Sequence, residues 1–463
     1  MPTLETLDIS SGRVCLRDVR VVDIVRGHTT GPVNVIIENG RIAAVDAPPQ
    51  GTDIPAQNLT LVPGLIDCHS HILSPFLTKQ EGFLGAWTMR QIGRNLRTNL
   101  ASGVVLVQDM LSPIRIMNKV RWLLERGTLA GPSIRASGAI LSCEGGYPEF
   151  IFPIPWPLAG IIGSPKYHLS SESDARKMVA YLHKCGADHI KIGYTSRPRD
   201  FHGPKMPVLK REILIAICDA AHALGLKVAV HHNWSCDIEP ILEANPDSLE
   251  HQCNDQVITD EHLALVKKKG VAVTPTLTVG HNMAYFDQKT EFMRSQAARE
   301  LFEPEAVQHL TFVADTWLDP NETSYHDVFG YWRGSHDVYD RATQTTRRLF
   351  EAGVPILCGT DFGAVTAFSG ETADEVRRLS MHGLGNLEAL RSATLRAAQH
   401  IGVEADYGSI EPGKRADFFL VEGDPLEDAA ALRNVRMVAK SGRWYKPGGD
   451  ITTPMFNKGY AFK

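Results

Sequence analysis

Residues 61–71 read Leu-Val-Pro-Gly-Leu-Ile-Asp-Cys-His-Ser-His, an apolar strand pattern that ends in two histidines. In an extended chain, residues i and i+2 point to the same side. His69 and His71 can therefore offer two imidazoles, which are common ligands of divalent metals, to one ion. A pair of this kind is moderate evidence alone, because histidine pairs also occur on solvent-facing edge strands. Further ligands must come from elsewhere in the chain.

Other apolar stretches also end in a residue that can bind a metal, or carry a buried-type lysine. These residues are His231, His251, Asp361 and Lys191. Each has an ordinary explanation, because an inward histidine can be a hydrogen-bonded core residue and a lysine can extend to solvent. Barrel enzymes, however, place their active groups at the C-terminal ends of several strands. Chance agreement of all six positions is low, so the sequence predicts a divalent metal centre.

Strand and helix patterns alternate through the middle of the chain. Candidate strands end near His69, Asp109, Ser142, Lys191, His231, His251, Thr276 and Asp361. Between them, residues 173–185 and 208–224 keep apolar side chains at helical spacing, and the first of these stretches opens on an N-cap candidate. Eight strands alternating with helices predict an α/β fold, a (β/α)8 TIM barrel over residues 63–406.

Both ends of the chain carry strand patterns instead. Asn39-Gly40 lies between two such patterns, 33–38 and 41–45, and is the signature of a type I′ hairpin turn. Further strand-like stretches are 14–17, 19–22, 416–421 and 435–440. We therefore expect a small β-sandwich domain built from both termini, residues 1–62 and 407–463.

One long connection breaks the short-loop pattern of the middle region. Residues from about 277 to 350 are rich in aromatic side chains and helical in places. A connection of this length is usually functional. We expect it either to cover a substrate or to form a satellite helical hairpin that packs on the barrel.

The overall composition is ordinary for a globular protein, and its charges are nearly balanced. The chain has 463 residues, with 48 Lys and Arg against 53 Asp and Glu, which gives a formal charge of −5. This balance favours neither nucleic acid nor an anionic membrane. Eight cysteines without a CxxC pair indicate reduced thiols. With no basic and apolar leader pattern at the N-terminus, we expect a cytoplasmic protein.

Several motifs along the chain resemble those of a known family. The matching motifs, in chain order, are PGLIDCHSH, GPSIRASGAILS, GADHIKI, LGLKVAVH, DSLEH, GVPILCGTD and GSIEPGKRADFFLVEGDPLED. Their order and spacing resemble the amidohydrolase superfamily, closest to its imidazolonepropionase-like and Xaa-Pro dipeptidase (prolidase)-like branch. The resemblance covers nearly the whole chain.

The resemblance implies a role for each candidate ligand. His69 and His71 would bind a first metal, His231 and His251 a second, and Lys191, carboxylated by carbon dioxide, would bridge the two. Asp361 would bind a metal and act as general base and acid on a bridging hydroxide. Two divalent ions are implied, zinc first, with cobalt, manganese or iron as alternatives.

The sequence departs from the family pattern where substrate is recognised. Tyr147 stands where relatives often carry a histidine, and Asn233 replaces the second histidine of a common HAHG motif. Tyr147 can act in catalysis by donating a hydrogen bond to an oxyanion, or it can be an aromatic wall residue. Other aromatic residues near these motifs that predict a pocket for an apolar or aromatic group are Tyr194, Trp234, Phe150, Phe152 and Trp156.

Together these features predict an enzyme, a hydrolase acting on carbon–nitrogen bonds. We expect it to cleave an amide, urea or carbamate-type bond of a small molecule with an apolar or aromatic group. One alternative is deamination of a heterocycle, although Lys191 favours the two-metal hydrolase. A lactonase or esterase activity on the same centre is another. The family also implies a homo-oligomer.

Overall fold

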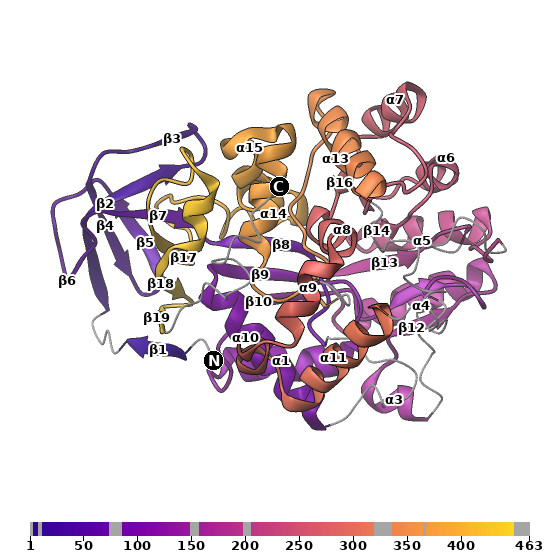
Figure 1. Cartoon of the computed structure of the whole chain (residues 1–463), viewed down its shortest axis with the longest axis horizontal. Helices are drawn as coiled ribbons and strands as arrows, with labels where there is room; N and C mark the ends of the chain where they lie inside the picture. The colour runs from indigo at the N-terminus through magenta and orange to yellow at the C-terminus, as the bar shows by residue number, and fades with distance from the viewer. Residues whose placement is uncertain are drawn as a thin grey trace.

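A computed structural model of the chain describes most of its length. The described residues are 3–7, 12–73, 86–148, 157–197, 205–318, 336–363 and 367–448. Figure 1 shows a β-rich part, drawn in indigo and yellow and thus built from both ends of the chain. It lies beside a larger part in which strands and helices mix.

The β-rich part is a single ten-stranded sheet in which strands from the two ends of the chain pair with each other. Its strands are β1 (Thr3–Leu7), β2 (Arg13–Asp23), β3 (His28–Thr29), β4 (Val33–Glu38), β5 (Arg41–Val45), β6 (Thr52–Pro55), β7 (Leu59–Pro63), β17 (Phe418–Glu422), β18 (Val435–Lys440) and β19 (Arg443–Gly448). Their order is β1-β19-β18-β17-β7-β2-β4-β5, with β3 and β6 also pairing with β2.

The hairpin between β4 and β5 forms at the predicted turn. Asn39 and Gly40 both have positive φ, 51° and 73°, as a type I′ turn requires. The prediction of two separate strands over 14–17 and 19–22 is wrong, because both lie in β2. Its register shifts between Leu16 and Val19, around Asp18 with its φ of 56°. An irregularity of this kind bends a strand without ending it.

The larger part contains parallel strands in two hydrogen-bonded groups. The strands are β8 (Leu65–Ser70), β9 (Val104–Asp109), β10 (Ser133–Ala136), β11 (Ile140–Ser142), β12 (Lys166–His168), β13 (His189–Gly193), β14 (Lys227–His231), β15 (Ser248–Glu250) and β16 (Ala272–Thr274). One group runs β10-β9-β8 and the other β12-β11-β13-β14-β15-β16. The backbone N–H of Asp188, just before β13, donates to the carbonyl of Ala136 in β10 at 2.9 Å, so the two groups meet there.

Residues 356–362 connect the last strand back to the first. Ile356 forms a bridge with Val273 of β16, and Phe362 forms one with Ser70 of β8. The predicted strand before Asp361 is thus present only as isolated bridges. Asp361 itself, with a φ of 57°, leaves the extended conformation at the end of this segment. These bridges link β16 back to β8 through residues 356–362, as a closed barrel requires, while the predicted number of eight barrel strands stays a prediction.

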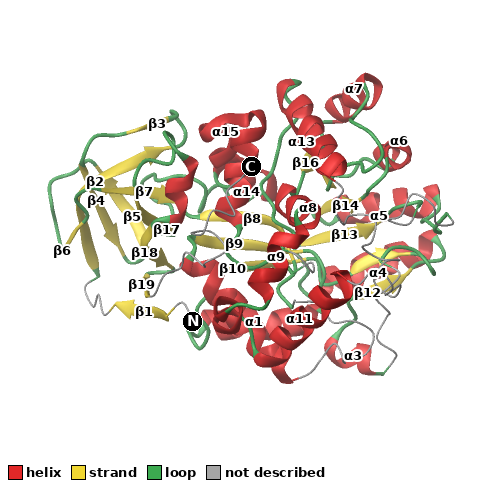
Figure 2. Ribbon diagram, in the orientation of Figure 1, coloured by secondary structure: helices red, strands yellow, loops and turns green. Residues whose placement is uncertain are grey.

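Helices cover the outside of these strands (Figure 2). Those of the first two thirds are α1 (Ala86–Ala101), α2 (Ile114–Glu125), α3 (Leu158–Ile162), α4 (Glu172–Lys184), α5 (Arg211–Ala223), α6 (Ser235–Glu243) and α7 (Asp260–Lys269). The later ones are α14 (Thr372–Leu379), η2 (Ser380–Leu384), α15 (Gly385–Ser392), α16 (Leu395–Ile401) and η3 (Ala429–Arg433). α4 begins one residue before its predicted range, because Ser171 Oγ caps it by accepting a hydrogen bond from the backbone N–H of Asp174.

The long connection after β16 is helical over most of its described length. Its helices are α8 (Leu277–Ala284), α9 (Phe286–Met293), α10 (Gln296–Leu301), α11 (Pro304–Leu318) and α13 (His336–Glu351). α8 packs against α13, and α9 packs against α11. This connection is therefore a group of helices and not an irregular loop.

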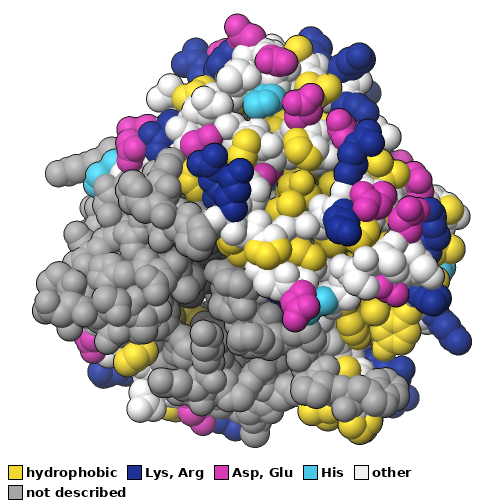
Figure 3. Space-filling view, turned by 90° about the vertical axis from the view of Figure 1, so that its right-hand side faces the viewer, with side chains coloured by type: hydrophobic (Ala, Val, Ile, Leu, Met, Phe, Trp, Pro, Cys, Tyr) yellow, Lys and Arg dark blue, Asp and Glu magenta, His cyan; other side chains and the backbone are white. Residues whose placement is uncertain are grey.

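The described surface has no dominant charge on the face at the right of Figure 1. There, basic and acidic side chains are interspersed with apolar ones (Figure 3). No helix in the described part of the chain combines the length and apolar character needed to cross a bilayer.

Candidate metal centre

The end of β8 meets the end of the 356–362 segment at the centre of the larger part. The backbone N–H of Asp361 donates to the carbonyl of His69 at 2.8 Å. This contact brings Asp361 Oδ1 to 3.4 Å from His69 Nε2 and to 2.9 Å from His71 Nε2. Both histidines of the first motif therefore lie against the same carboxylate.

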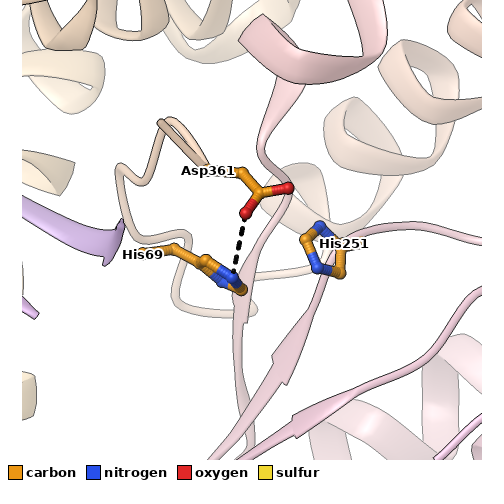
Figure 4. Close-up of side chains that lie close together, drawn as sticks. All are labelled: His69, His251 and Asp361. Atoms are coloured by element: carbon orange, nitrogen blue, oxygen red, sulfur yellow. Dashed lines mark ion pairs between the residues drawn. The ribbon is translucent and has the colours of Figure 1, made fainter. Parts of the chain in front are cut away.

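Two more of the candidate histidines join this cluster from neighbouring strands. The ligand atoms of His69, His251 and Asp361 all lie within 4.8 Å of one another (Figure 4). The ring centroid of His251 is 4.7 Å from that of His69 and 4.6 Å from that of His231. Residues from β8, β14, the end of β15 and the 356–362 segment thus meet at one point.

Lys191, the sixth candidate, is buried in β13. It pairs with Ala229 of β14, two residues before His231. Its Nζ has no hydrogen-bond partner among the described residues. Burial lowers the pKa of Lys191 from 10.5 to about 8, although the charges of Glu250 and Asp361 raise it. A buried amine without a partner is costly, which suggests that another group completes its environment.

The backbone is strained at three consecutive strand ends of the cluster. His251, Thr276 and Asp361 have φ values of 73°, 51° and 57°. Non-glycine residues in this left-handed region cost about 1–3 kcal/mol each. Such strain is found mainly at functional sites, so it supports a function for this end of the strands.

A buried carboxylate orients His69. His69 Nδ1 lies 2.6 Å from Glu250 Oε2, and both side chains are almost fully buried. The other oxygen of Glu250 accepts from Ser248 Oγ at 2.5 Å. A carboxylate only accepts hydrogen bonds, so Nδ1 of His69 carries the proton and Nε2, on the side of Asp361, is left to bind a metal.

Polar side chains also orient two more histidines of the cluster, His231 and His251. His231 Nε2 donates to Asn233 Oδ1 at 2.7 Å, which leaves Nδ1 as the atom that can bind a metal. His251 Nδ1 lies 2.8 Å from Thr276 Oγ1. Asn233, a departure from the family pattern, thus has a structural reason: its amide oxygen orients His231.

The protonation states in the cluster suit metal ligands. Burial and the nearby Lys191 charge lower the pKa of His69 well below its usual value, so its imidazole is neutral. Burial raises the pKa of Asp361, but the hydrogen bond from His71 and other electrostatic interactions, among them that with Lys191, outweigh it and lower that pKa overall. A neutral imidazole beside an ionised carboxylate is a typical donor set for zinc-like ions.

Asp67 and Gly359 hold the two ends of the cluster together. Asp67 accepts hydrogen bonds from Thr360 Oγ1 at 2.6 Å and from the backbone N–H of His69 at 3.1 Å. A Cβ on Gly359 would lie 2.5 Å from Thr274 Cγ2 and 2.9 Å from His69 N. Only glycine allows the last segment to approach β8 this closely.

A cavity opens beside the cluster. Its described lining is His231, Asn233, His251, Gln252, Asn254, Pro275, Thr276, Leu277, Val279, Gly280, Met283, Tyr339, Ala342 and Asp361. Three of the candidate ligands therefore face a space that a small molecule can enter. Several lining residues come from α8 and α13 of the long connection.

Tyr147 lies beside the cluster but outside this lining. Its ring stacks on His231, with centroids 3.8 Å apart and an angle of 10° between the planes. Lys166, which is buried, holds the Tyr147 loop by donating to the carbonyls of Gly146 at 2.7 Å and Pro148 at 2.9 Å. Both interpretations of Tyr147, hydrogen-bond donor and aromatic wall, are compatible with this position.

The structure does not bring Tyr194 and Trp234 to the cavity. Both side chains are buried, and Trp234 Nε1 donates to the carbonyl of Arg197 at 3.1 Å. Burial and the nearby Asp237 raise the pKa of Tyr194 to about 12. Their role as substrate contacts stays a prediction. Phe150, Phe152 and Trp156 lie outside the described residues.

Sequence reasoning missed four residues that shape the site: Glu250, Thr276, Asn254 and Tyr339. Glu250 had a signal, because it is an acid within the apolar stretch before His251. The others gave none, because their roles depend on contacts between distant segments.

Comparison with known proteins identifies the family. Residues 60–445 match the amidohydrolase family. The chain belongs to this family. It is thus a hydrolase acting on carbon–nitrogen bonds, which confirms the predicted enzyme class. Members of this family generally use a divalent metal centre, and the cluster of His69, His251 and Asp361 is a candidate for it.

Individual relatives agree with the predicted branch of the amidohydrolases. Ochratoxinase of Aspergillus niger is 26% identical over 419 residues, which cover 84% of this chain and 76% of that protein. The crystal structure of a Xaa-Pro dipeptidase with bound methionine has a TM-score of 0.72 at 23% identity, covering 94% of this chain and all of that one. Phenylurea hydrolase B has a TM-score of 0.68 at 19% identity, with coverages of 96% and 98%. The chain shares the fold of these enzymes.

If the hydrogen bond between Glu250 and His69 orients His69 for a metal, its loss should lower the affinity of the site for zinc. Glu250→Gln keeps the shape of the side chain but removes its charge, and its amide can present an NH2 group to His69. We expect the Kd for zinc, measured by competition with a chelating dye, to rise about 10–100-fold. Glu261→Gln, at an exposed position of α7, is the matched control. Equal zinc affinity in both variants and the parent would contradict the role of Glu250.

Proposed function

We propose that this chain is a two-metal hydrolase that cleaves an amide, urea or carbamate-type C–N bond of a small molecule with an apolar or aromatic group. The observation that carries the proposal is the convergence of His69, His251 and Asp361, whose ligand atoms lie within 4.8 Å of one another. His71 and His231 contact this cluster directly. Zinc is the proposed ion, with cobalt, manganese or iron as alternatives.

The donor set fits two divalent ions. His69 and His71 would hold one ion, His231 and His251 the other, and Asp361 would add a carboxylate. Carboxylation of Lys191 would convert a repelling cation into an anionic group with two oxygens. The lack of a hydrogen-bond partner for Lys191 Nζ among the described residues supports this assignment. Divalent ions bound there would lower the pKa of a coordinated water toward about 7 and polarise the carbonyl of the substrate.

The side chains would then manage the protons of the reaction. As water adds to the carbonyl carbon, Asp361 would accept a proton on its carboxylate and deliver it to the leaving nitrogen. The C–N bond then breaks with release of a neutral amine, and expulsion of an amide anion is avoided. Tyr147, whose ring stacks on His231, would donate a hydrogen bond to the carbonyl oxygen.

We also propose a division into two units. Residues 63–406 would form the TIM barrel with an insertion at about 277–350, and residues 1–62 with 407–463 the small β-sandwich domain. Strands from the two ends of the chain pair with each other, β17 with β7 and β1 with β19, which supports a composite terminal domain.

The hydrolase proposal is tested by turnover. The unmodified chain should release amine from at least one compound in a panel of arylamides, N-aryl ureas, carbamates, dipeptides and N-acyl amino acids. Lys191→Ala and Asp361→Asn should each lower kcat by at least about 10²-fold, while the thermal unfolding midpoint shows that the fold survives. Full turnover in either folded variant would contradict the assigned roles. Release of ammonia from an aminated heterocycle without ring opening would favour deamination instead.

Carboxylation of Lys191 should depend on pH. Neutral amine reacts with carbon dioxide to give carbamate and a proton, whereas the protonated amine does not react. Because burial lowers the pKa of Lys191 to about 8, its neutral fraction rises with pH through that value. We expect 13C NMR of the metal-free chain in 13C-bicarbonate to show more carbamate at about pH 8.5 than at about pH 6.5. A signal that is independent of pH, or that persists in Lys191→Ala, would contradict this.

A further inference from the structure

We infer that Asn254 and the cavity-lining residues of α8 and α13 form the substrate subsite. This subsite takes an uncharged amide, urea or carbamate with an apolar side group. The inference rests on the proposed hydrolase function, and it adds that the substrate is uncharged and which residues select it. Asn254 would donate a hydrogen bond to an acceptor oxygen of the substrate, and the helices would contact its apolar group.

The carboxamide of Asn254 is buried in the cavity lining, and its NH2 group lacks an acceptor among the described residues. Its Nδ2 makes no hydrogen bond to any described residue, although the side chain is only 1% exposed. A buried N–H group without an acceptor costs about 1–3 kcal/mol. The carbonyl or ether oxygen of a bound substrate can satisfy this group.

The main chain of Asn254 is held in place from both sides. Its backbone N–H donates to the carbonyl of Asn233 at 2.8 Å. Its carbonyl accepts from Arg341 Nε of α13 at 2.9 Å. Because Asn233 also orients His231, Asn254 is fixed relative to the metal cluster. A substrate bound to Asn254 would therefore be positioned for attack.

The opposite wall of the cavity is apolar. Leu277, Val279 and Met283 of α8 and Tyr339 of α13 are buried there, and the partly exposed Ala342 of α13 also lines the cavity. The Tyr339 hydroxyl lies 3.2 Å from His382 Nε2, and burial raises the pKa of Tyr339 to about 12, so the phenol is neutral. This leaves its ring as the part available to an apolar group. These side chains belong to the long connection. This connection would therefore select substrates by their apolar group.

The charges of the lining favour uncharged substrates. Among the described residues that line the cavity, none is a lysine or arginine, and Asp361 is an acid. Arg341, at the rim of this region, already contacts Asp337 and the Asn254 carbonyl. A carboxylate on the substrate would lose its hydration without gaining a cation from these side chains.

Three chromogenic anilides test the subsite by binding. They are the 4-nitroanilides of acetic, hexanoic and succinic acid, which differ in the size and charge of one group. Titration calorimetry uses the metal-loaded Asp361→Asn chain, in which turnover is suppressed. We expect the hexanoyl compound to bind at least about tenfold more tightly than the succinyl compound.

Two substitutions in the same background separate the parts of the subsite. Asn254→Leu removes the donor at similar volume and should raise the Kd of the acetyl and hexanoyl compounds alike by about tenfold. Ala342→Phe fills the apolar wall and should raise the Kd of the hexanoyl compound about tenfold while changing that of the acetyl compound less than about twofold. Gln344→Phe, at an exposed position of α13, is the matched control and should change neither.

The outcomes distinguish the subsite from the hydrolase itself. Preference for the succinyl compound, or an unchanged Kd in Asn254→Leu and in a folded Ala342→Phe, would overturn the subsite even if the unmodified chain cleaves anilides. If Ala342→Phe does not fold, Asn254→Leu alone decides. If the binding pattern holds but the unmodified, metal-loaded chain cleaves no compound of the hydrolysis panel, the subsite stands and the proposed hydrolysis fails.

Discussion

The site depends on the contact between the first and last segments of the parallel strands. The hydrogen bond from the backbone N–H of Asp361 to the carbonyl of His69 joins residues that are 292 positions apart in sequence (361 − 69). Asp67 reinforces this contact by accepting from Thr360 and from the His69 N–H, and Gly359 allows the close approach. Without this closure, the carboxylate and the first two histidines would not share one point. Strain at His251, Thr276 and Asp361 is tolerated because the surrounding strands fix them.

Much of the candidate site could be predicted from the sequence, because strand periodicity is local. Two things were enough to predict the candidate ligands. One is the local spacing of histidines such as His69 and His71 at the ends of apolar stretches, and the other is the rule that parallel strands end at one edge of a barrel. The residues that orient these ligands could not be predicted in the same way. Glu250 and His69 are far apart in the chain, and their 2.6 Å contact depends on how β8 and β15 lie across the interior. For Tyr194 and Trp234 the sequence could not show how deeply each aromatic side chain is buried, because burial depends on the packing of distant segments.

The terminal strands show a similar limit. The Asn39-Gly40 turn was predictable, because its positive φ values are a local property of those residues. The continuity of β2 was not, because the irregularity at Asp18 is stabilised by pairing with β4 and β6. In the same way, residues 356–362 have the composition of a strand but form only isolated bridges. The sequence of this amidohydrolase therefore defines the class of its chemistry better than the identity of its substrate.

The central claim is that the cluster holds divalent metal, and metal content tests it most directly. The chain is purified without chelator, and its metals are measured by inductively coupled plasma mass spectrometry alongside its protein concentration. The account predicts about two divalent ions per chain, as a bridged centre requires. A chain without stoichiometric divalent metal would contradict the account, and a saturating content of one ion would contradict the bridging role of Lys191.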